Sequence, residues 1–476
     1  MNIKHFISLV LIVTFFFQAV APARASFTID DENKIGKEFY EKLSNHNILI
    51  RDKKVNDYMT RLGNMILARS SNVLFTFHFS VIRSSAINAF ATPGGYVYVY
   101  QGLINLCDNE SELAGVLAHE MAHVNSRHIA QQIEKSQKIN MASLAAILAG
   151  VFLGGGGVGT EATLGLTMAT STALSLKYSR ENEEEADRKG MSYLVNTGYD
   201  GKGMLTFLKK MKSYEFYSNS MPSYFMTHPG TDERIGYIDS LLQSRYRGVG
   251  SKNIIGGLKR IQTLLMIDEV NPDDALKYFR NRLEKNPDDI DALYGLAVTQ
   301  AKLGQSAASF ANFSKALSLS PDDVDILRDM GQSYFDAGGT ADAITLLRRA
   351  YSLDEKDDGT LFYLGRAYEQ AGNFGMALEF YRKYLEINPA DVNILYNIAM
   401  AYGQNGNQGE SHYYFALFFK KKNKPESALF HFKEAQKIAP PGSEREKDIQ
   451  REMEALSKRN TSQKDFQSEG KRRREF

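Results

Sequence analysis

The feature that most constrains this chain is a run at residues 118–123, in which two histidines stand four residues apart and a glutamate directly follows the first. Apolar residues recur at helical spacing around this run, which predicts a helix over residues 111–129. Four residues turn a helix by about 400°, so His119 and His123 leave it about 40° apart and one turn above each other. Two imidazoles placed in this way can bind one metal ion.

The glutamate between the two histidines is Glu120, which lies about 100° around the helix from His119. It is close enough to reach a water molecule on the ion without being a ligand, so it is placed as a general base. The alternative is a helix that carries two solvent-exposed or core histidines. Asn109 with Glu112 three residues later is the pattern of a capping box, which predicts where the helix begins.

A second acidic element follows at residues 178–190, where Glu183 and Asp187 are four residues apart on one helical face. A catalytic zinc site has three protein ligands and one open position. His119, His123 and Glu183 provide such a set, and Asp187 is placed to accept the far N–H of a ligand histidine. The sequence therefore predicts one Zn²⁺ per chain, with manganese and iron compatible with the same donors.

The first residues have the layout of a secretory signal peptide. Lys4 and His5 precede an apolar run at residues 6–17, and Ala23-Arg24-Ala25 follows before Ser26. We therefore expect residues 1–25 to be a signal peptide that is cleaved after Ala25, which predicts a periplasmic protein. An uncleaved N-terminal anchor is the alternative, and retention of the whole segment would favour a soluble intracellular peptidase.

Composition excludes some classes of protein and leaves others open. The chain has 476 residues, enough for two or three domains, and a formal net charge of +1, which argues against nucleic acid as a partner. The single cysteine, Cys107, cannot form an internal disulfide. We expect it to be a buried small hydrophobe, with a redox role as the alternative.

Before the histidine motif, residues 27–72 are predicted to be helical and residues 73–82 to form a strand. Residues 88–103 combine a Pro-Gly-Gly turn with a strand of alternating aromatic and β-branched residues. The strand residues are Tyr96, Val97, Tyr98, Val99 and Tyr100. This strand is a candidate for pairing its backbone with an extended peptide substrate, and an ordinary hairpin is the alternative.

Four elements together resemble the gluzincin metallopeptidases of the HtpX and CAAX-prenyl-endopeptidase type. They are the histidine motif, the 88–103 stretch, the element from Ser179 to Asp187, and His228-Pro229 with Arg234. The resemblance covers residues 27 to about 245.

The resemblance also implies roles for single residues. Glu183, rather than its two glutamate neighbours, would be the third ligand. His228 can take the fourth metal position and hold the enzyme latent, and Arg234 lines the active site. On the residues alone, His228-Pro229 is also typical of a helix start.

The remaining histidines are predicted to lie outside the metal site. His128 follows His123 by five residues, so on a continuous helix it would point about 140° away from it and would not be a ligand. The others have no partner at ligand spacing and are expected to be structural or exposed. They are His46, His78, His412 and His431.

The segment at residues 141–176 is predominantly apolar and is interrupted by a glycine run at residues 154–157. This pattern predicts a helical hairpin with a loose end. Three uses compete: packing on the catalytic core, a lid over the cleft, or peripheral contact with a membrane or an unfolded client.

From about residue 251 the sequence repeats with a period of 34 residues, which is the tetratricopeptide signature. Glycines keep this interval at positions 304, 338, 372 and 406, and so do Pro287, Pro321, Glu355 and Pro389. Such arrays offer a concave face for extended or helical partners. The repeats are expected over residues 251–450, including an extra helix, and a basic disordered tail over residues 451–476.

These patterns predict a fold of the α+β class, mainly α, in which a zincin-like domain with a small sheet at residues 26–250 precedes a helical repeat solenoid. They predict a zinc metalloendopeptidase. The resemblance implies polypeptide substrates such as misfolded or unassembled envelope proteins, a role in protein quality control and outer-membrane protein assembly, and contact of the repeats with the assembly machinery. The alternative is a chaperone or adaptor whose metal site is latent or structural.

Overall fold

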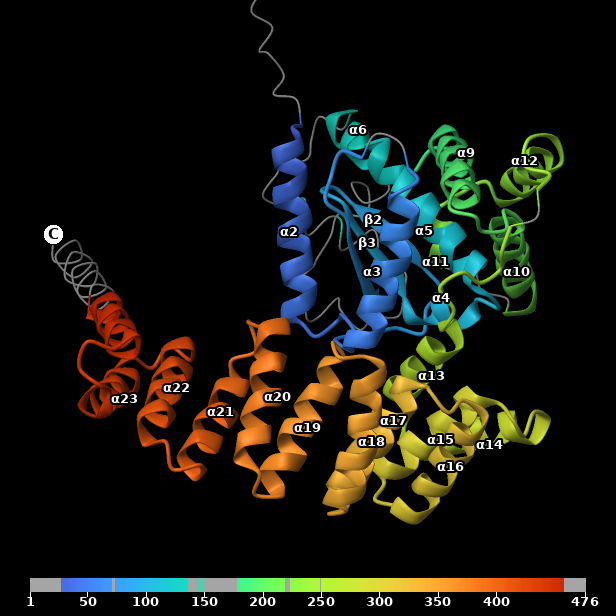
Figure 1. The fold of residues 1–476 in the computed structure, drawn as a ribbon. Helices are drawn as coiled ribbons and strands as arrows, with labels where there is room; N and C mark the ends of the chain where they lie inside the picture. Colours follow the sequence, from blue (N-terminus) through green and yellow to red (C-terminus); the bar gives the residue numbers. More distant parts are fainter. Residues whose placement is uncertain are drawn as a thin grey trace, which may run out of the picture. The chain divides into compact units, whose positions relative to one another are not determined.

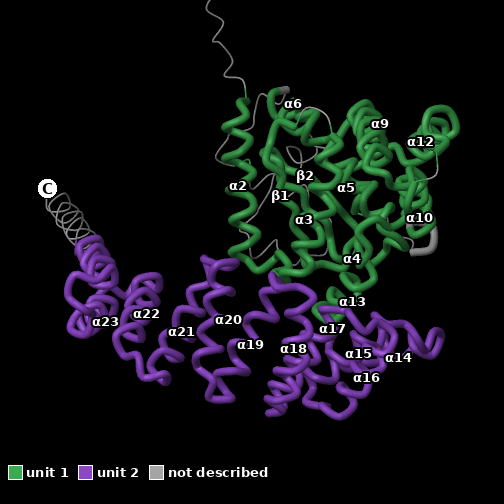
Figure 2. Tube along the Cα trace, viewed as in Figure 1, with its two compact units in different colours: residues 1–270 green, residues 271–476 purple. Residues whose placement is uncertain are grey.

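The fold was analysed in a computed structural model, which describes residues 27–70, 73–135, 144, 148, 178–218, 223–248 and 250–457 (Figure 1). The chain divides into two compact units, Met1–Val270 and Asn271–Phe476 (Figure 2). The expected signal peptide at residues 1–25, the apolar hairpin apart from Leu144 and Leu148, and the end of the basic tail lie outside the described residues. Within the described part of the chain, no helix combines the length and the apolar character needed to cross a membrane.

Unit 1 begins with two helices, α2 (Ile29–Asn45) and α3 (Lys53–Leu67), which confirms the helical prediction for this region. α2 starts with a capping box between Thr28 and Asp31. Its residues at helical spacing, among them Ile35 and Phe39, are buried. The apolar periodicity of the sequence thus marks the face that packs on the core.

A three-stranded sheet follows, made of β1 (His78–Ile82), β2 (Ala89–Thr92) and β3 (Tyr96–Tyr100). The strand order is β1-β3-β2, with β3 parallel to β1 and antiparallel to β2. Gly94 and Gly95 form the turn between β2 and β3 with φ of 82° and 89°, a region that L side chains rarely adopt.

The alternation along β3 divides its side chains between two cores. Tyr98 and Tyr100 belong to a cluster with Phe39 of α2, whereas Val97 and Val99 face the larger core that contains residues of α3 and of the helix with the histidine motif. The rings of Phe39 and Tyr98 meet edge to face with centroids 5.5 Å apart. This confirms the strand but corrects its role. The β3 backbone is paired on both sides, so it has no free edge for a substrate peptide.

The helix that carries the histidine motif is α5 (Glu110–Asn125), which follows α4 (Gln101–Leu106). Asn109 caps it as predicted, although the Glu112 carboxylate accepts from the N–H of Asp108 rather than from that of Asn109. The helix ends earlier than expected. Arg127 has a φ of 53°, and a new helix, α6 (His128–Lys135), begins directly after it.

Cys107 lies between α4 and α5. It is free and buried, as predicted, and its thiol donates to the carbonyl of Leu103. Burial raises the pKa of this thiol, so it remains protonated at neutral pH. It therefore packs as a small hydrophobe.

The other helices of unit 1 are α9 (Arg180–Asn196), α10 (Lys202–Ser218), α11 (Ser223–Thr227), α12 (Thr231–Ser244) and α13 (Leu258–Glu269). Helix α5 packs against α9 and α10, and α12 packs against α10 (Figure 1). Leu258, Ile261 and Leu265 of α13 belong to the main core of unit 1. The unit therefore extends to Val270, beyond the predicted domain boundary at residue 250.

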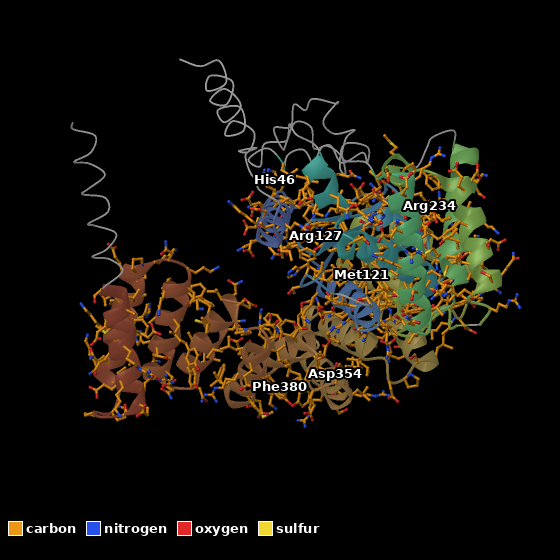
Figure 3. All side chains as sticks on the ribbon, turned by 90° about the horizontal axis from the view of Figure 1, so that it is seen from above. His46, Met121, Arg127, Arg234, Asp354 and Phe380 are labelled. Carbon is orange, nitrogen blue, oxygen red and sulfur yellow. The ribbon has the colours of Figure 1, made fainter. Side chains whose placement is uncertain are left out.

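Unit 2 is an array of paired helices, with Phe380 buried within it (Figure 3). Its helices are α14 (Pro272–Lys285), α15 (Ile290–Lys302), α16 (Ser306–Leu319), α17 (Val324–Asp336), α18 (Thr340–Leu353), α19 (Asp358–Gln370), α20 (Phe374–Ile387), α21 (Asn393–Gln404), α22 (Gln408–Lys421) and α23 (Pro425–Ile438). The four glycines of the repeat all have positive φ, between 72° and 83°, where they end the first helix of each pair.

One detail of unit 2 differs from the predictions, and a second was not predicted. Residues 444–457 are helical, and Ile449 and Leu456 are buried against α22 and α23, so the chain stays folded past residue 451. His412 and His431 face each other across α22 and α23, with their Nδ1 atoms 2.9 Å apart. Their pairing was not apparent from spacing because they lie on different helices.

The start of α5 is fixed by a buried carboxylate. Glu110 accepts hydrogen bonds from the hydroxyls of Tyr58 and Tyr199, both 2.9 Å long, and from the N–H groups of Ile254 at 2.7 Å and Ile255 at 2.9 Å. One side chain thus connects α3, α5 and the segment before α13.

We expect Glu110→Gln to lower the free energy of unfolding of unit 1 by about 2–4 kcal/mol, because an amide NH₂ cannot accept from these donors. Calorimetric unfolding measures the effect, with Glu38→Gln on the exposed face of α2 as the control. A Glu110→Gln protein as stable as the control would show that this network does not hold the helix.

Candidate metal centre

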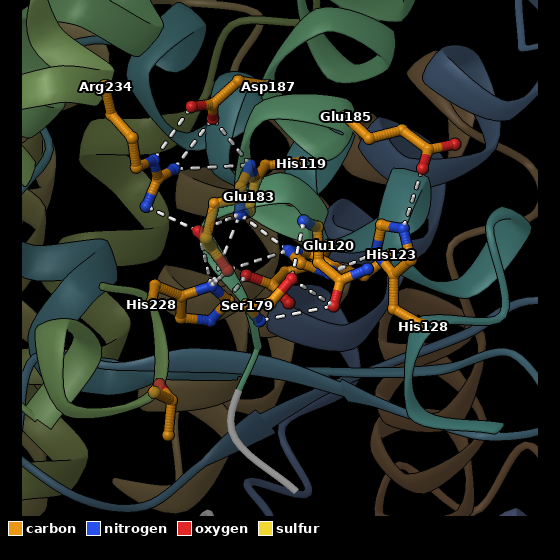
Figure 4. A network of polar contacts seen from close by, with 12 residues as sticks. His119, Glu120, His123, His128, Ser179, Glu183, Glu185, Asp187, His228 and Arg234 are labelled. Atoms are coloured by element: carbon orange, nitrogen blue, oxygen red, sulfur yellow. Dashed lines mark hydrogen bonds and ion pairs between the residues drawn. The ribbon is translucent and has the colours of Figure 1, made fainter. Parts of the chain in front are cut away.

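Four buried side chains converge between α5 and α9 (Figure 4). The Nε2 atoms of His119 and His123 are 3.0 Å apart. Each is 3.4 Å from a different carboxylate oxygen of Glu183. His228, from the segment between α11 and α12, completes the group, and all four ligand atoms lie within 4.8 Å of one another. The structure thus brings together the three predicted ligands and the fourth residue implied by the resemblance.

The close contact of α5 with α9 sets this geometry. Gly190 of α9 lies against the backbone of His119, where an added Cβ would come within 3.0 Å of the His119 Cα. Ser179 caps α9 through a capping box with Asn182, so Glu183 falls in the first turn of the helix and faces α5. A glycine at the crossing point therefore allows the carboxylate to reach the two imidazoles.

Asp187 supports the centre from behind His119, as predicted. Its Oδ1 is 2.9 Å from the His119 Nδ1, and its carboxylate also accepts two hydrogen bonds of 2.8 Å from Arg234. Arg234 is also 2.7 Å from Glu183. Arg234 thus links the buried carboxylate of the ligand Glu183 to that of Asp187 rather than lining an open surface.

Burial alone would raise the pKa of both carboxyl groups. For Glu183, the nearby His228 and Arg234 outweigh that effect and hold its pKa well below the usual range. For Asp187, Arg234 together with His119 lowers the pKa in the same way. Both groups are therefore ionised at neutral pH, which suits Glu183 as a metal ligand and Asp187 as the partner of the Arg234 guanidinium.

Glu120 lies beside the cluster. It is fully buried, and neither of its carboxylate oxygens has a hydrogen-bond partner among the described residues. The His228 Nε2 lies 3.5 Å from the Glu120 Oε1. Burial raises the pKa of Glu120, although His228 and His119 offset part of the effect. A buried carboxylate without partners is costly, so this position fits a group that acts on a molecule bound at the centre.

Two aromatic residues that the sequence did not single out cover the cluster. The Tyr178 ring lies over His123 with centroids 3.7 Å apart, and the Tyr224 ring stacks on His228 at 4.4 Å. With His228 in place, every ligand side chain is at most 2% exposed. The arrangement is closed to a polypeptide.

The His128 side chain does not point in the predicted direction. The expectation that it points away from His123 assumed one continuous helix, but the break at Arg127 turns it back. Its Nδ1 lies 2.9 Å from the Nδ1 of His123, and its Nε2 lies 3.3 Å from Glu185 (Figure 4). It is not among the ligand atoms, as predicted. No glycine or proline marks the break, so the sequence held no signal for it.

The donor set fits a single metal ion. Imidazole and carboxylate donors suit Zn²⁺ and related divalent ions. The Glu120 oxygens and the His228 Nε2, which have no hydrogen-bond partner among the described residues, are the polar atoms that a bound ion and its surroundings would satisfy.

Two histidines on one helix, a carboxylate from a second helix and a glutamate beside them define a site of the metallopeptidase class. The model of the family described as "Peptidase family M48" matches residues 52–242, and tetratricopeptide repeat models match residues 270–324, 328–392 and 380–413. The metalloprotease YcaL of Escherichia coli is 30% identical over 193 residues, which span 40% of this chain and 72% of that protein. The chain belongs to peptidase family M48.

Other relatives are similar to this chain over a comparable length. The β-barrel assembly-enhancing protease of Yersinia pestis is 34% identical over 214 residues, and that of Escherichia coli strain K12 is 33% identical over 215 residues. In both cases the match spans 45% of this chain and 44% of the relative. The chain thus matches less than half the length of these relatives.

We expect Arg234→Lys to lower the free energy of unfolding of the metal-free protein by about 2–4 kcal/mol, because an ammonium cannot hold two buried carboxylates in a bidentate manner. Calorimetry of the metal-free protein measures the loss. Arg180→Lys is the matched control, since Arg180 pairs with Glu233 between the same two helices but is exposed. Equal stability of the two variants would contradict the buried role of Arg234.

Proposed function

We propose that the protein is a zinc-dependent endopeptidase of the metalloendopeptidase class EC 3.4.24. The observation that carries this proposal is the convergence of His119, His123 and Glu183 beside the carboxylate of Glu120, which has no hydrogen-bond partner among the described residues. A purely structural metal site has no need of a buried acceptor next to its ligands.

Zinc bound by His119, His123 and Glu183 would polarise the scissile carbonyl and acidify a water molecule. Glu120 would take the proton of that water and pass it to the leaving amine. Asp187 would keep His119 in the tautomer that presents Nε2 to the metal. Arg234 would hold Asp187 and Glu183 in place and balance their charge.

Substrate alignment belongs to β2 rather than to β3 in this proposal. Among the described strands, β2 pairs with β3 alone, and it also contacts α5. A pocket lies at its end, lined by Thr92, Pro93, His123 and Tyr178 among others. An extended peptide added to β2 would lie beside the ligand His123.

His228 would hold the enzyme latent in the closed arrangement. It stands 3.1 Å from Glu183 and 3.5 Å from Glu120, where a substrate carbonyl and a water molecule would have to enter. Gly230, two residues later, has a φ of 84°, so the backbone has a glycine about which it can move. Activity would require His228 to leave.

The repeats would bind client polypeptides or a partner assembly. The relatives from Yersinia pestis and Escherichia coli are named β-barrel assembly-enhancing proteases, which supports a role in the assembly of β-barrel proteins. We propose that this role is in outer-membrane protein assembly and envelope quality control. Misfolded or unassembled envelope proteins would then be the substrates, and the assembly machinery a partner of the repeat face. This role requires export to the periplasm with removal of residues 1–25, which mass spectrometry of the mature N-terminus tests.

We expect Glu120→Gln to lower the rate of cleavage of an unfolded polypeptide such as reduced casein by about 10²–10⁴-fold while zinc stays bound. Elemental analysis measures the bound zinc, and electrophoresis measures the cleavage rate. Glu184→Gln, on the exposed face of α9, is the control. If Glu120→Gln keeps its zinc and cleaves like the control, the catalytic role fails and a binding scaffold remains.

We expect His228→Ala to increase cleavage of the same substrate on the order of ten-fold, because the closed arrangement loses its fourth ligand. His46→Ala, an exposed histidine at the end of α2, should leave the rate unchanged. A zinc-loaded His228→Ala protein that is no faster than the wild type would show that His228 does not restrict the site.

A further inference from the structure

The two ligand histidines have different supports, and only that of His119 follows the usual pattern of a carboxylate on the far ring nitrogen. On the far side of His123, the Nδ1 faces the Nδ1 of His128 at 2.9 Å instead. The His128 ring is buried, and the two ring centroids are 4.9 Å apart at an interplanar angle of 76°. A second imidazole thus stands where a carboxylate is usual.

From His128 the contacts continue to the edge of unit 1. The His128 Nε2 lies 3.3 Å from Glu185, whose other carboxylate oxygen is 2.6 Å from the Lys189 ammonium. Ser126 joins this group, since its hydroxyl donates to Glu185 at 3.2 Å and accepts from Lys189 at 2.9 Å. His123, His128 and Glu185 thus form a row of polar contacts. The row ends on the Glu185 carboxylate, which a lysine and a serine hold in place.

Metal binding would give this row a direction. With the His123 Nε2 on the ion, the His123 Nδ1 must carry the proton, so the His128 Nδ1 must accept. His128 then carries its proton on Nε2, which donates to Glu185. Each step requires the one before it, so a single tautomer of both rings satisfies the whole row.

We propose that His128 and Glu185 are positioning residues for the metal ligand His123. His128 extends the reach of the Glu185 carboxylate to the His123 ring and fixes the tautomer that presents Nε2 to the metal. This inference rests on the metal centre proposed above.

The turn at Arg127 serves this arrangement. Its left-handed backbone directs His128 back onto α5. Its guanidinium is fixed by Glu32 at 2.6 Å and by the carbonyl of Phe27 at 2.7 Å. Residues from the start of the chain therefore help to hold His128 against the ligand.

The simpler explanation is that His128 only fills space at the start of α6. The side-chain geometry separates the two explanations. The amide oxygen of an asparagine occupies nearly the position of the histidine Nδ1, so His128→Asn keeps an acceptor for His123 but cannot reach Glu185. His128→Leu has a similar branch point but no acceptor. Glu185→Gln keeps an acceptor for His128 without the charge.

The test is the zinc dissociation constant of the full chain, measured by competition with a chromophoric chelator, together with the melting temperature of the zinc-free protein. We expect His128→Leu to weaken zinc binding by about 10–100-fold and His128→Asn to recover most of that loss. Glu185→Gln should weaken binding by a smaller factor, and the exposed control Glu184→Gln should not change it. The Co²⁺ absorption spectrum should shift in His128→Leu and remain close to wild type in His128→Asn.

Two results would overturn the inference. One is zinc affinity in His128→Leu equal to that of the wild type. The other is an equal loss of zinc affinity in His128→Leu and His128→Asn, accompanied by a lower melting temperature of both zinc-free proteins. That result would show that His128 only fills space. Absence of zinc binding in the wild-type chain would instead contradict the proposed function itself, so the two failures are distinguishable.

Discussion

The close contact between α5 and α9 is the constraint on which the rest of unit 1 depends. It places Glu183 against two histidines and Asp187 behind one of them, all inside the core. Buried carboxylates are costly unless cations and hydrogen bonds compensate for them. Arg234 provides that compensation for both carboxylates, and Gly190 lets the helices approach closely enough for the contacts to form.

The two sides of the centre are built differently. On the α12 side, Asp187 contacts His119 directly, and the Arg234 guanidinium holds it in a buried position. On the α6 side, an imidazole stands between His123 and a carboxylate near the surface. The first arrangement keeps the Asp187 charge away from solvent, whereas the contacts of the second extend to Glu185 near the surface. Among the described residues, His228 and two tyrosines cover the ligands, so binding of a polypeptide requires the centre to open.

Sequence patterns predicted what depends on local spacing. The histidine pair, Glu183 and the 34-residue repeat all follow from which residues share a helical face or a repeat position. The patterns failed where the chain changes direction without a glycine or proline, as at Arg127, which placed His128 wrongly. They also could not predict strand order, because alternation in β3 shows burial on two faces but not which neighbours pair with it. Tyr178 and Tyr224 reach the centre through tertiary packing, for which no motif exists.

The most direct test of this account is the anomalous diffraction of crystals of the zinc-loaded chain, measured on both sides of the zinc absorption edge. The account predicts one zinc peak in unit 1, with ligand bonds of about 2.0–2.2 Å to His119, His123 and Glu183. Crystals of fully loaded protein in which no zinc lies between these three residues would contradict it.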